Sequence, residues 1–245
     1  MSSSLLRASV IALAFGKAAQ TLTYLDDSMA EGFGAGSVSY RDFVEQVQNG
    51  DLILTSSTSA TSINRMMTGS LWSHVGMAYV AKDGRIFEWS AHSSNEVIDN
   101  SNGIPCGGPQ LVPLDRLVAE SGAVFWRQVN MAEDQRAGIG PIVKKLAYKL
   151  PFSDNVEFLS YLGWPFSKMF AGYGGGMACP HIVAATYATV GAIDLDRDVS
   201  LFTPESFSET GDAKWNVSVG RTSMVVGFDA TRLVKIPPLI IRDKK

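Results

Sequence analysis

The segment GGGMACPHIVAATYATVG, residues 174–191, contains the pattern that decides the fold. Three glycines lead to Cys179, and Pro180 follows at a position where its missing N–H is harmless to a helix. The residues after it are small or apolar until Gly191, a typical helix stop. We therefore predict a helix from Cys179 to Gly191 that is apolar on nearly all sides and buried at the centre of the fold.

Cys179 stands at the first turn of this predicted helix, where free backbone N–H groups and the helix dipole favour a thiolate over a thiol. That environment is typical of a cysteine nucleophile. The alternative is a small core residue, since free cysteine is among the most buried residue types.

Composition limits the classes of function. The chain has 245 residues, 46% of them hydrophobic, enough for a large core. A formal charge of −3 without a long basic run argues against a nucleic-acid partner. The two cysteines, Cys106 and Cys179, favour an intracellular, reducing compartment over a disulfide scaffold. Three histidines without CxxC or HExxH spacing argue against a metal site, and we expect no cofactor.

The first 39 residues are predicted to be an N-terminal extension, made of an amphipathic helix and a connector over 26–39. Residues 1–25 contain no acid, and a targeting presequence is the alternative for them. Their apolar run is far shorter than the roughly 20 residues that span a bilayer, so no transmembrane span is expected. Residues 40–245 are predicted to form a single domain.

A hairpin is predicted from the strand at 72–80, the turn Lys82-Asp83-Gly84 and the strand at 85–90. The register of the hairpin decides which side chains share a face. If the numbers of two residues paired across the hairpin add up to an even value, His74 and Glu88 lie on one face within side-chain reach. A two-residue turn gives an odd sum, which sends Glu88 to the far face. The sequence leaves both registers open.

The remaining elements follow from periodicity and turn residues. Helices are predicted at 40–47, 63–67 and 114–120, from Pro141 to 150 and from Thr203-Pro204, and strands at 52–55, 95–99, 122–129, 223–228 and 232–236, with residues 100–110 as a loop. The aromatic-rich residues 152–173 are either a lid over an apolar substrate or core.

A strand histidine, an acid on the next strand and a cysteine at a helix start are the parts of a thiol hydrolase. Their order here is histidine, acid, cysteine. The set Gly50-Asp51-Leu52-Ile53, Ser73-His74-Val75-Gly76-Met77, Ile86-Phe87-Glu88 and the Cys179 helix followed by Thr203-Pro204 resembles the circularly permuted NlpC-type papain-like proteins, the YiiX/YaeF-like group.

The resemblance covers residues 40–208. It implies an α+β fold, with a curved antiparallel sheet packed on the cysteine helix. It also implies that Cys179 is the nucleophile, His74 the base and Glu88 the residue that orients it. Family members commonly have Cys-Ser-Glu where this chain has Cys179-Pro180-His181.

Four further residues complete the candidate site. His92 is a rival of Glu88 for the third role, and Ser73 and His181 are accessory candidates, with His181 a wall or cap residue. Asp51 is interpreted as structural, capping backbone at the start of its strand.

The implied activity is hydrolysis of a peptide or acyl-amide bond by a cysteine peptidase or amidase through a covalent acyl-enzyme. Two alternatives stay open. One is a lipid acyltransferase or thioesterase, for which the aromatic residues 152–173 suggest a lipid-like substrate. The other is a catalytically silent module that binds a protein partner in a larger assembly.

Overall fold

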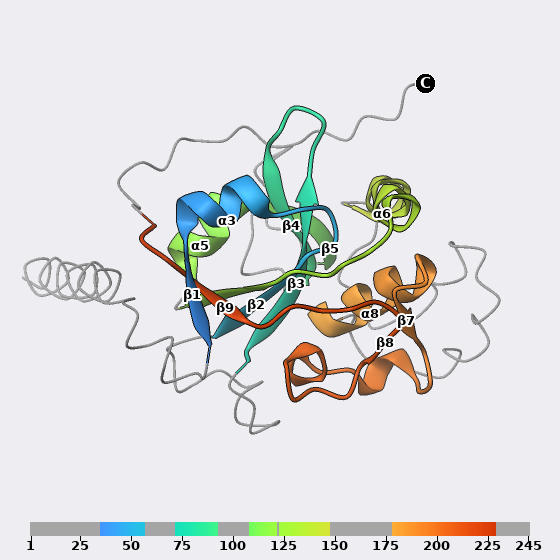
Figure 1. Cartoon of the computed structure of the whole chain (residues 1–245). Helices are drawn as coiled ribbons and strands as arrows, with labels where there is room; N and C mark the ends of the chain where they lie inside the picture. The colour runs from blue at the N-terminus through green and yellow to red at the C-terminus, as the bar shows by residue number, and fades with distance from the viewer. Residues whose placement is uncertain (1–34, 57–71, 93–107, 122, 148–177, 229–245) are drawn as a thin grey trace, which may run out of the picture.

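The computed structural model describes residues 35–56, 72–92, 108–121, 123–147 and 178–228. Its centre is a seven-stranded sheet with the order β1-β9-β6-β2-β3-β4-β5 (Figure 1). Only β1 and β9 pair in parallel; the other neighbours are antiparallel. The strands are β1 (Gly36–Ser39), β2 (Leu52–Ser56), β3 (His74–Val80), β4 (Ile86–His92), β5 (Gly108–Pro113), β6 (Ala123–Arg127) and β9 (Ser223–Val226).

Helices lie on both sides of this sheet (Figure 1). They are α3 (Tyr40–Gln46), α5 (Leu114–Glu120), α6 (Glu133–Leu146) and α8 (Cys179–Thr189), followed by the short 3-10 turns η2 (Val199–Leu201) and η3 (Pro204–Phe207). A separate two-stranded sheet pairs β7 (Ile193–Asp194) with β8 (Lys214–Trp215). The chain is therefore a mixed α+β fold with a mostly antiparallel sheet.

Two hydrophobic cores form, one on each face of the sheet. Strand β2 shows why: Leu52 and Leu54 join the core that contains α6 and α8, while Ile53 joins the core that contains α3 and α5. Successive side chains of a strand point to opposite faces. A strand that is buried on both faces is apolar at every position and does not alternate between apolar and polar residues. The run Leu52-Ile53-Leu54 has this pattern.

Helix α8 begins at Cys179 and ends within two residues of Gly191, as predicted, and its side chains from Ile182 to Tyr187 are buried. It packs against β3 and β4. Two buried hydrogen bonds fix its position: Trp89 Nε1 donates to Thr186 Oγ1 at 3.1 Å, and the Tyr187 hydroxyl donates to the Gly50 carbonyl at 2.8 Å. The start of α8 is thereby held at a fixed place relative to the sheet.

The β3–β4 hairpin has the even register. Met77 pairs with Trp89 and Ala78 with Glu88. The loop has three residues, 82–84, closed by the Ala81 N–H donating to the Arg85 carbonyl, and Gly84 takes a φ of 81°. A three-residue loop with glycine in the left-handed region is a common hairpin closure. It places His74 and Glu88 on one face.

Several boundaries differ from the sequence prediction. The strand β5 covers Gly108–Pro113, although residues 100–110 were predicted as a loop. Its prolines are tolerated because β5 is the last strand in the sheet order. Residues 36–39, predicted as connector, form β1 beside β9.

Helix α6 also begins earlier than predicted, at Glu133 rather than at Pro141, which lies inside the helix on an exposed position. The Gln135 side chain accepts from the Ala132 N–H and so caps the true start. The helix predicted at Thr203-Pro204 is the short 3-10 turn η3.

Other predictions fall outside the described residues: the helix at 63–67, the strands at 95–99 and 232–236, the aromatic residues 152–173, the N-terminal residues 1–25 and the loop that holds Cys106.

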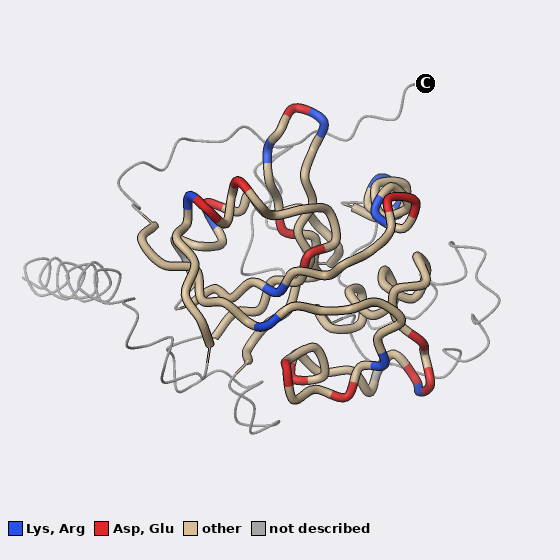
Figure 2. Tube along the Cα trace, viewed as in Figure 1, with Lys and Arg blue, Asp and Glu red and all other residues tan. Residues whose placement is uncertain are grey.

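Charges of both signs are interleaved along the described trace (Figure 2). Arg85 pairs with Asp83 at the hairpin tip, and Arg41 pairs with Glu45 on α3. Among the described residues, no helix combines the length and the apolar character needed to cross a membrane.

Candidate active site

Cys179 and His74 meet because each is the first residue of its element, Cys179 of α8 and His74 of β3. Cys179 lies close enough to His74 for its sulfur to raise the pKa of the imidazole. Cys179 is buried, with 6% of its surface exposed, and 15% of the His74 side chain is exposed. The pair therefore lies beneath the surface, and the imidazole is its more accessible member.

Glu88 holds the other side of the His74 ring. His74 Nε2 lies 2.8 Å from Glu88 Oε1, and the Glu88 side chain has no exposed surface. An ionised carboxylate only accepts hydrogen bonds, so His74 Nε2 carries the proton and Nδ1 is left as the basic nitrogen. Glu88 and Cys179 thus both act on His74, Glu88 through a hydrogen bond and Cys179 through its effect on the imidazole pKa.

Gly76 provides the space that this contact needs. Glu88 pairs with Ala78, and its side chain leans along the sheet over Gly76 to reach His74. A Cβ atom on Gly76 would lie 2.2 Å from Glu88 Oε1 and 2.4 Å from Glu88 Cγ. The sequence motif includes Gly76 but gives it no such role, although a glycine inside a strand is a known sign of close approach.

Gly76→Ala should therefore destabilise the protein by about 1–3 kcal/mol, because the added methyl group must displace a buried carboxylate. Urea unfolding measures the change. The matched control is Gly140→Ala, where a Cβ meets nothing within 4 Å in helix α6, and a neutral or slightly stabilising effect is expected. An equally stable Gly76→Ala protein would show that Glu88 does not need this space.

A second histidine contacts the same carboxylate. His92 Nε2 lies 3.0 Å from Glu88 Oε2, and the His74 and His92 rings lie 4.5 Å apart between centroids with a 39° tilt. His92 does not replace Glu88 as the partner of His74; it occupies the other oxygen.

His74, Glu88 and His92 also form a donor set that could hold a metal ion, because one ligand atom of each lies within 4.8 Å of the others. Two imidazoles and a carboxylate suit zinc or ferrous iron. In this arrangement each Nε2 instead lies at hydrogen-bonding distance from its own carboxylate oxygen, which satisfies the set without an ion.

The electrostatics of the site favour charge separation. Burial by itself would lower the pKa of His74, but the negative charges of Cys179 and Glu88 raise it well above its ordinary value. Burial would likewise raise the pKa of Glu88, but its contacts with His74 and His92 lower it to about 2. Glu88 is therefore ionised at neutral pH, and His74 readily holds a proton beside the cysteine sulfur.

The two remaining accessory candidates make local contacts. The Ser73 hydroxyl donates to the Thr55 carbonyl at 3.1 Å. His181 Nδ1 accepts from the Ala178 N–H at 3.3 Å, which caps the start of α8.

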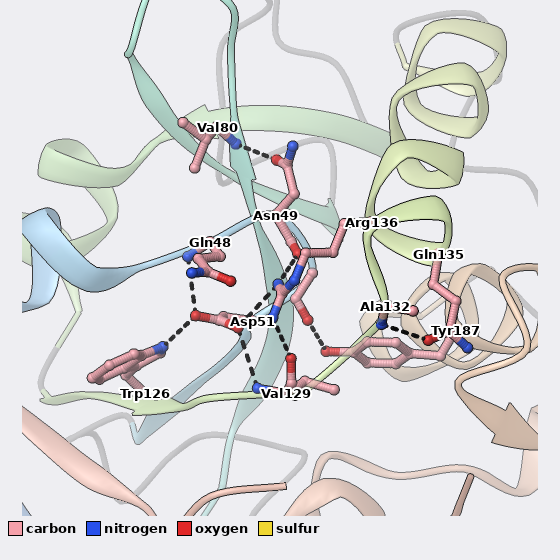
Figure 3. Close-up of polar contacts among 11 residues, drawn as sticks. Gln48, Asn49, Asp51, Val80, Trp126, Val129, Ala132, Gln135, Arg136 and Tyr187 are labelled. Carbon is pink, nitrogen blue, oxygen red and sulfur yellow. Dashed lines mark hydrogen bonds and ion pairs between the residues drawn. The ribbon is translucent and has the colours of Figure 1, made fainter. Parts of the chain in front are cut away.

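Asp51 lies apart from this site at the start of β2, fully buried (Figure 3). Its carboxylate accepts hydrogen bonds from the Gln48 N–H at 3.0 Å, the Trp126 indole N–H at 3.0 Å and the Val129 N–H at 3.2 Å. Arg136 Nη1, on α6, lies 3.5 Å away. Asp51 thus caps backbone at its strand and joins three further segments.

No family model matches the sequence, and no curated protein matches it. Among solved structures, the chain is similar to the metalloprotein YiiX, DUF1105, from Escherichia coli O157:H7. The sequence identity is 17%, the match covers 74% of this chain and 89% of that chain, and the TM-score is 0.41.

Proposed function

We propose that the chain is a thiol hydrolase of the circularly permuted NlpC-type papain-like group, and that it cleaves peptide or acyl-amide bonds. The observation that carries the proposal is the position of His74, whose Nε2 lies 2.8 Å from Glu88 Oε1 and whose pKa is raised by the nearby Cys179. Nucleophile, base and orienting group in mutual contact are the signature of activated-nucleophile catalysis.

In the proposed reaction the Cys179 sulfur attacks the carbonyl carbon of the substrate while His74 holds the proton taken from the thiol. Collapse of the tetrahedral intermediate breaks the C–N bond, and His74 transfers its proton to the leaving amine. Water then attacks the thioester, with His74 taking a proton from it, and the carboxylic acid leaves as the Cys179 thiol is restored. Glu88 keeps its negative charge throughout and fixes the tautomer of His74.

The start of α8 contributes one donor to this reaction. The N–H of Cys179 stands at the first helical position, where backbone N–H groups lack an intrahelical acceptor. It is the proposed donor to the oxyanion. Pro180 at the next position has no N–H, so a second oxyanion donor must come from another segment or from the His74 side of the site.

The reactivity of Cys179 tests the proposal against a silent module. At pH 6.5 a free thiol, with a pKa of about 8.5, is only about 1% thiolate. His74 stands beside Cys179 as a base that can activate the thiol, so Cys179 should react with iodoacetamide at least about tenfold faster than Cys106 at this pH. Peptide mass spectrometry measures both rates in one sample. Equal, slow alkylation of the two cysteines would favour the silent module.

A further inference from the structure

His92 is a titratable group at the site to which the proposed reaction gives no task. It stands at the end of β4, and its side chain is 7% exposed. Its Nε2 lies 3.0 Å from Glu88 Oε2, the oxygen that does not face His74. Within the hydrogen bonds of the described residues, each Glu88 oxygen is thus held by a different histidine.

This arrangement matters because Glu88 is completely buried. A buried carboxylate oxygen without a donor carries a desolvation cost, and a carboxyl group with one open oxygen can rotate or take up a proton. Rotation or protonation of Glu88 would release the Nε2–H of His74 and free its tautomer. A donor on Oε2 prevents both.

We propose that His92 is a positioning residue for the chemistry of Cys179. Its Nε2–H holds Oε2 of Glu88, so that the carboxylate stays ionised and keeps Oε1 on His74. The His92 ring, whose centroid lies 4.5 Å from that of His74 at a tilt of 39°, adds a wall that limits rotation of the His74 ring. The inference rests on the proposed function, since it assigns His92 a task in that same site.

A matched pair of amide variants tests this role. In His92→Gln the side-chain amide reaches the place of Nε2 and can donate to Glu88, whereas in His92→Asn the amide is one methylene shorter and cannot. We expect Cys179 alkylation at pH 6.5 to stay within about threefold of wild type in His92→Gln and to fall about tenfold in His92→Asn, as for a lost bond to a charged group.

The pH dependence of Cys179 alkylation distinguishes a positioning role of His92 from a general loosening of the structure. His92 and His74, on β4 and β3, are the titratable groups that hold the pKa of Glu88 at about 2. Loss of the His92 contact raises the pKa of Glu88. As the pH is lowered, alkylation of Cys179 should therefore be lost at a higher pH in His92→Asn than in His92→Gln. A loosened structure would instead lower the rate equally at all pH values.

The outcomes are distinct. Equal rates and profiles in both variants would overturn the role of His92. If EDTA changed the alkylation rate of Cys179 in wild type, and neither His92→Gln nor His92→Asn kept the wild-type rate, His92 would be a metal ligand. That result would overturn the positioning role as well. Failure of the proposed function itself would appear in the wild-type protein, as alkylation of Cys179 no faster than that of Cys106.

Discussion

Cys179→Ser should lower turnover by at least about a thousandfold on any substrate that the protein hydrolyses, because a serine hydroxyl is a far weaker nucleophile in a site built for a thiolate. The measurement is the initial rate of wild type and variant on panels of peptides, acyl-amides and thioesters. The class that wild type cleaves fastest also decides between amide hydrolysis and the lipid acyltransferase or thioesterase alternative.

Cys106→Ser is the control for this experiment, since it removes the chain's other thiol and leaves Cys179 in place. We expect it to retain the wild-type rate. Circular dichroism should show that both variants keep their fold. A Cys179→Ser protein that is folded and turns over substrate as fast as wild type would refute the assignment of the nucleophile.

Asp51→Ala should reduce the free energy of unfolding by about 3–5 kcal/mol, because it removes the shared acceptor of a buried network and leaves Arg136 without its carboxylate. The Trp126 indole N–H and the backbone N–H groups of Gln48 and Val129 lose their acceptor in the same step (Figure 3). Each unsatisfied buried donor is costly. Urea unfolding at neutral pH measures the loss.

Asp134→Ala is the matched control, an aspartate exposed in the first turn of α6. Its loss should cost less than about 1 kcal/mol, because an exposed charge near a helix start contributes little. If Asp51→Ala were no more destabilising than Asp134→Ala, the network around Asp51 would not be a main support of the fold.

The sequence predicts the helix at Cys179 and the strand at Leu52 well, because burial alone determines both. A helix that is apolar on nearly all sides must be buried, so the segment after the glycine run is predicted to be a central helix. A short apolar run before a turn is read as a buried strand. The hydrogen bond between Trp89 and Thr186 could not be predicted from the sequence, because it joins residues far apart in the chain.

The geometry of the candidate site depends on features that periodicity does not carry. The register that puts His74 and Glu88 on one face follows from a three-residue loop ending at Gly84, and the sequence permitted a two-residue loop equally well. The tilt of Glu88 over Gly76 depends on packing of side chains from two strands. Strand β5 was missed because its glycine and prolines have the local pattern of a loop, which sheet pairing overrides.

The central claim is that the sulfur of Cys179 forms a covalent bond to the acyl group of the substrate while His74 and Glu88 manage the proton. Mass spectrometry of protein quenched with acid during turnover tests it most directly. We predict an acyl group on the peptide that contains Cys179, absent from Cys179→Ser and from unreacted protein. Steady turnover with Cys179 unmodified, or with the acyl group on another residue, would contradict the account.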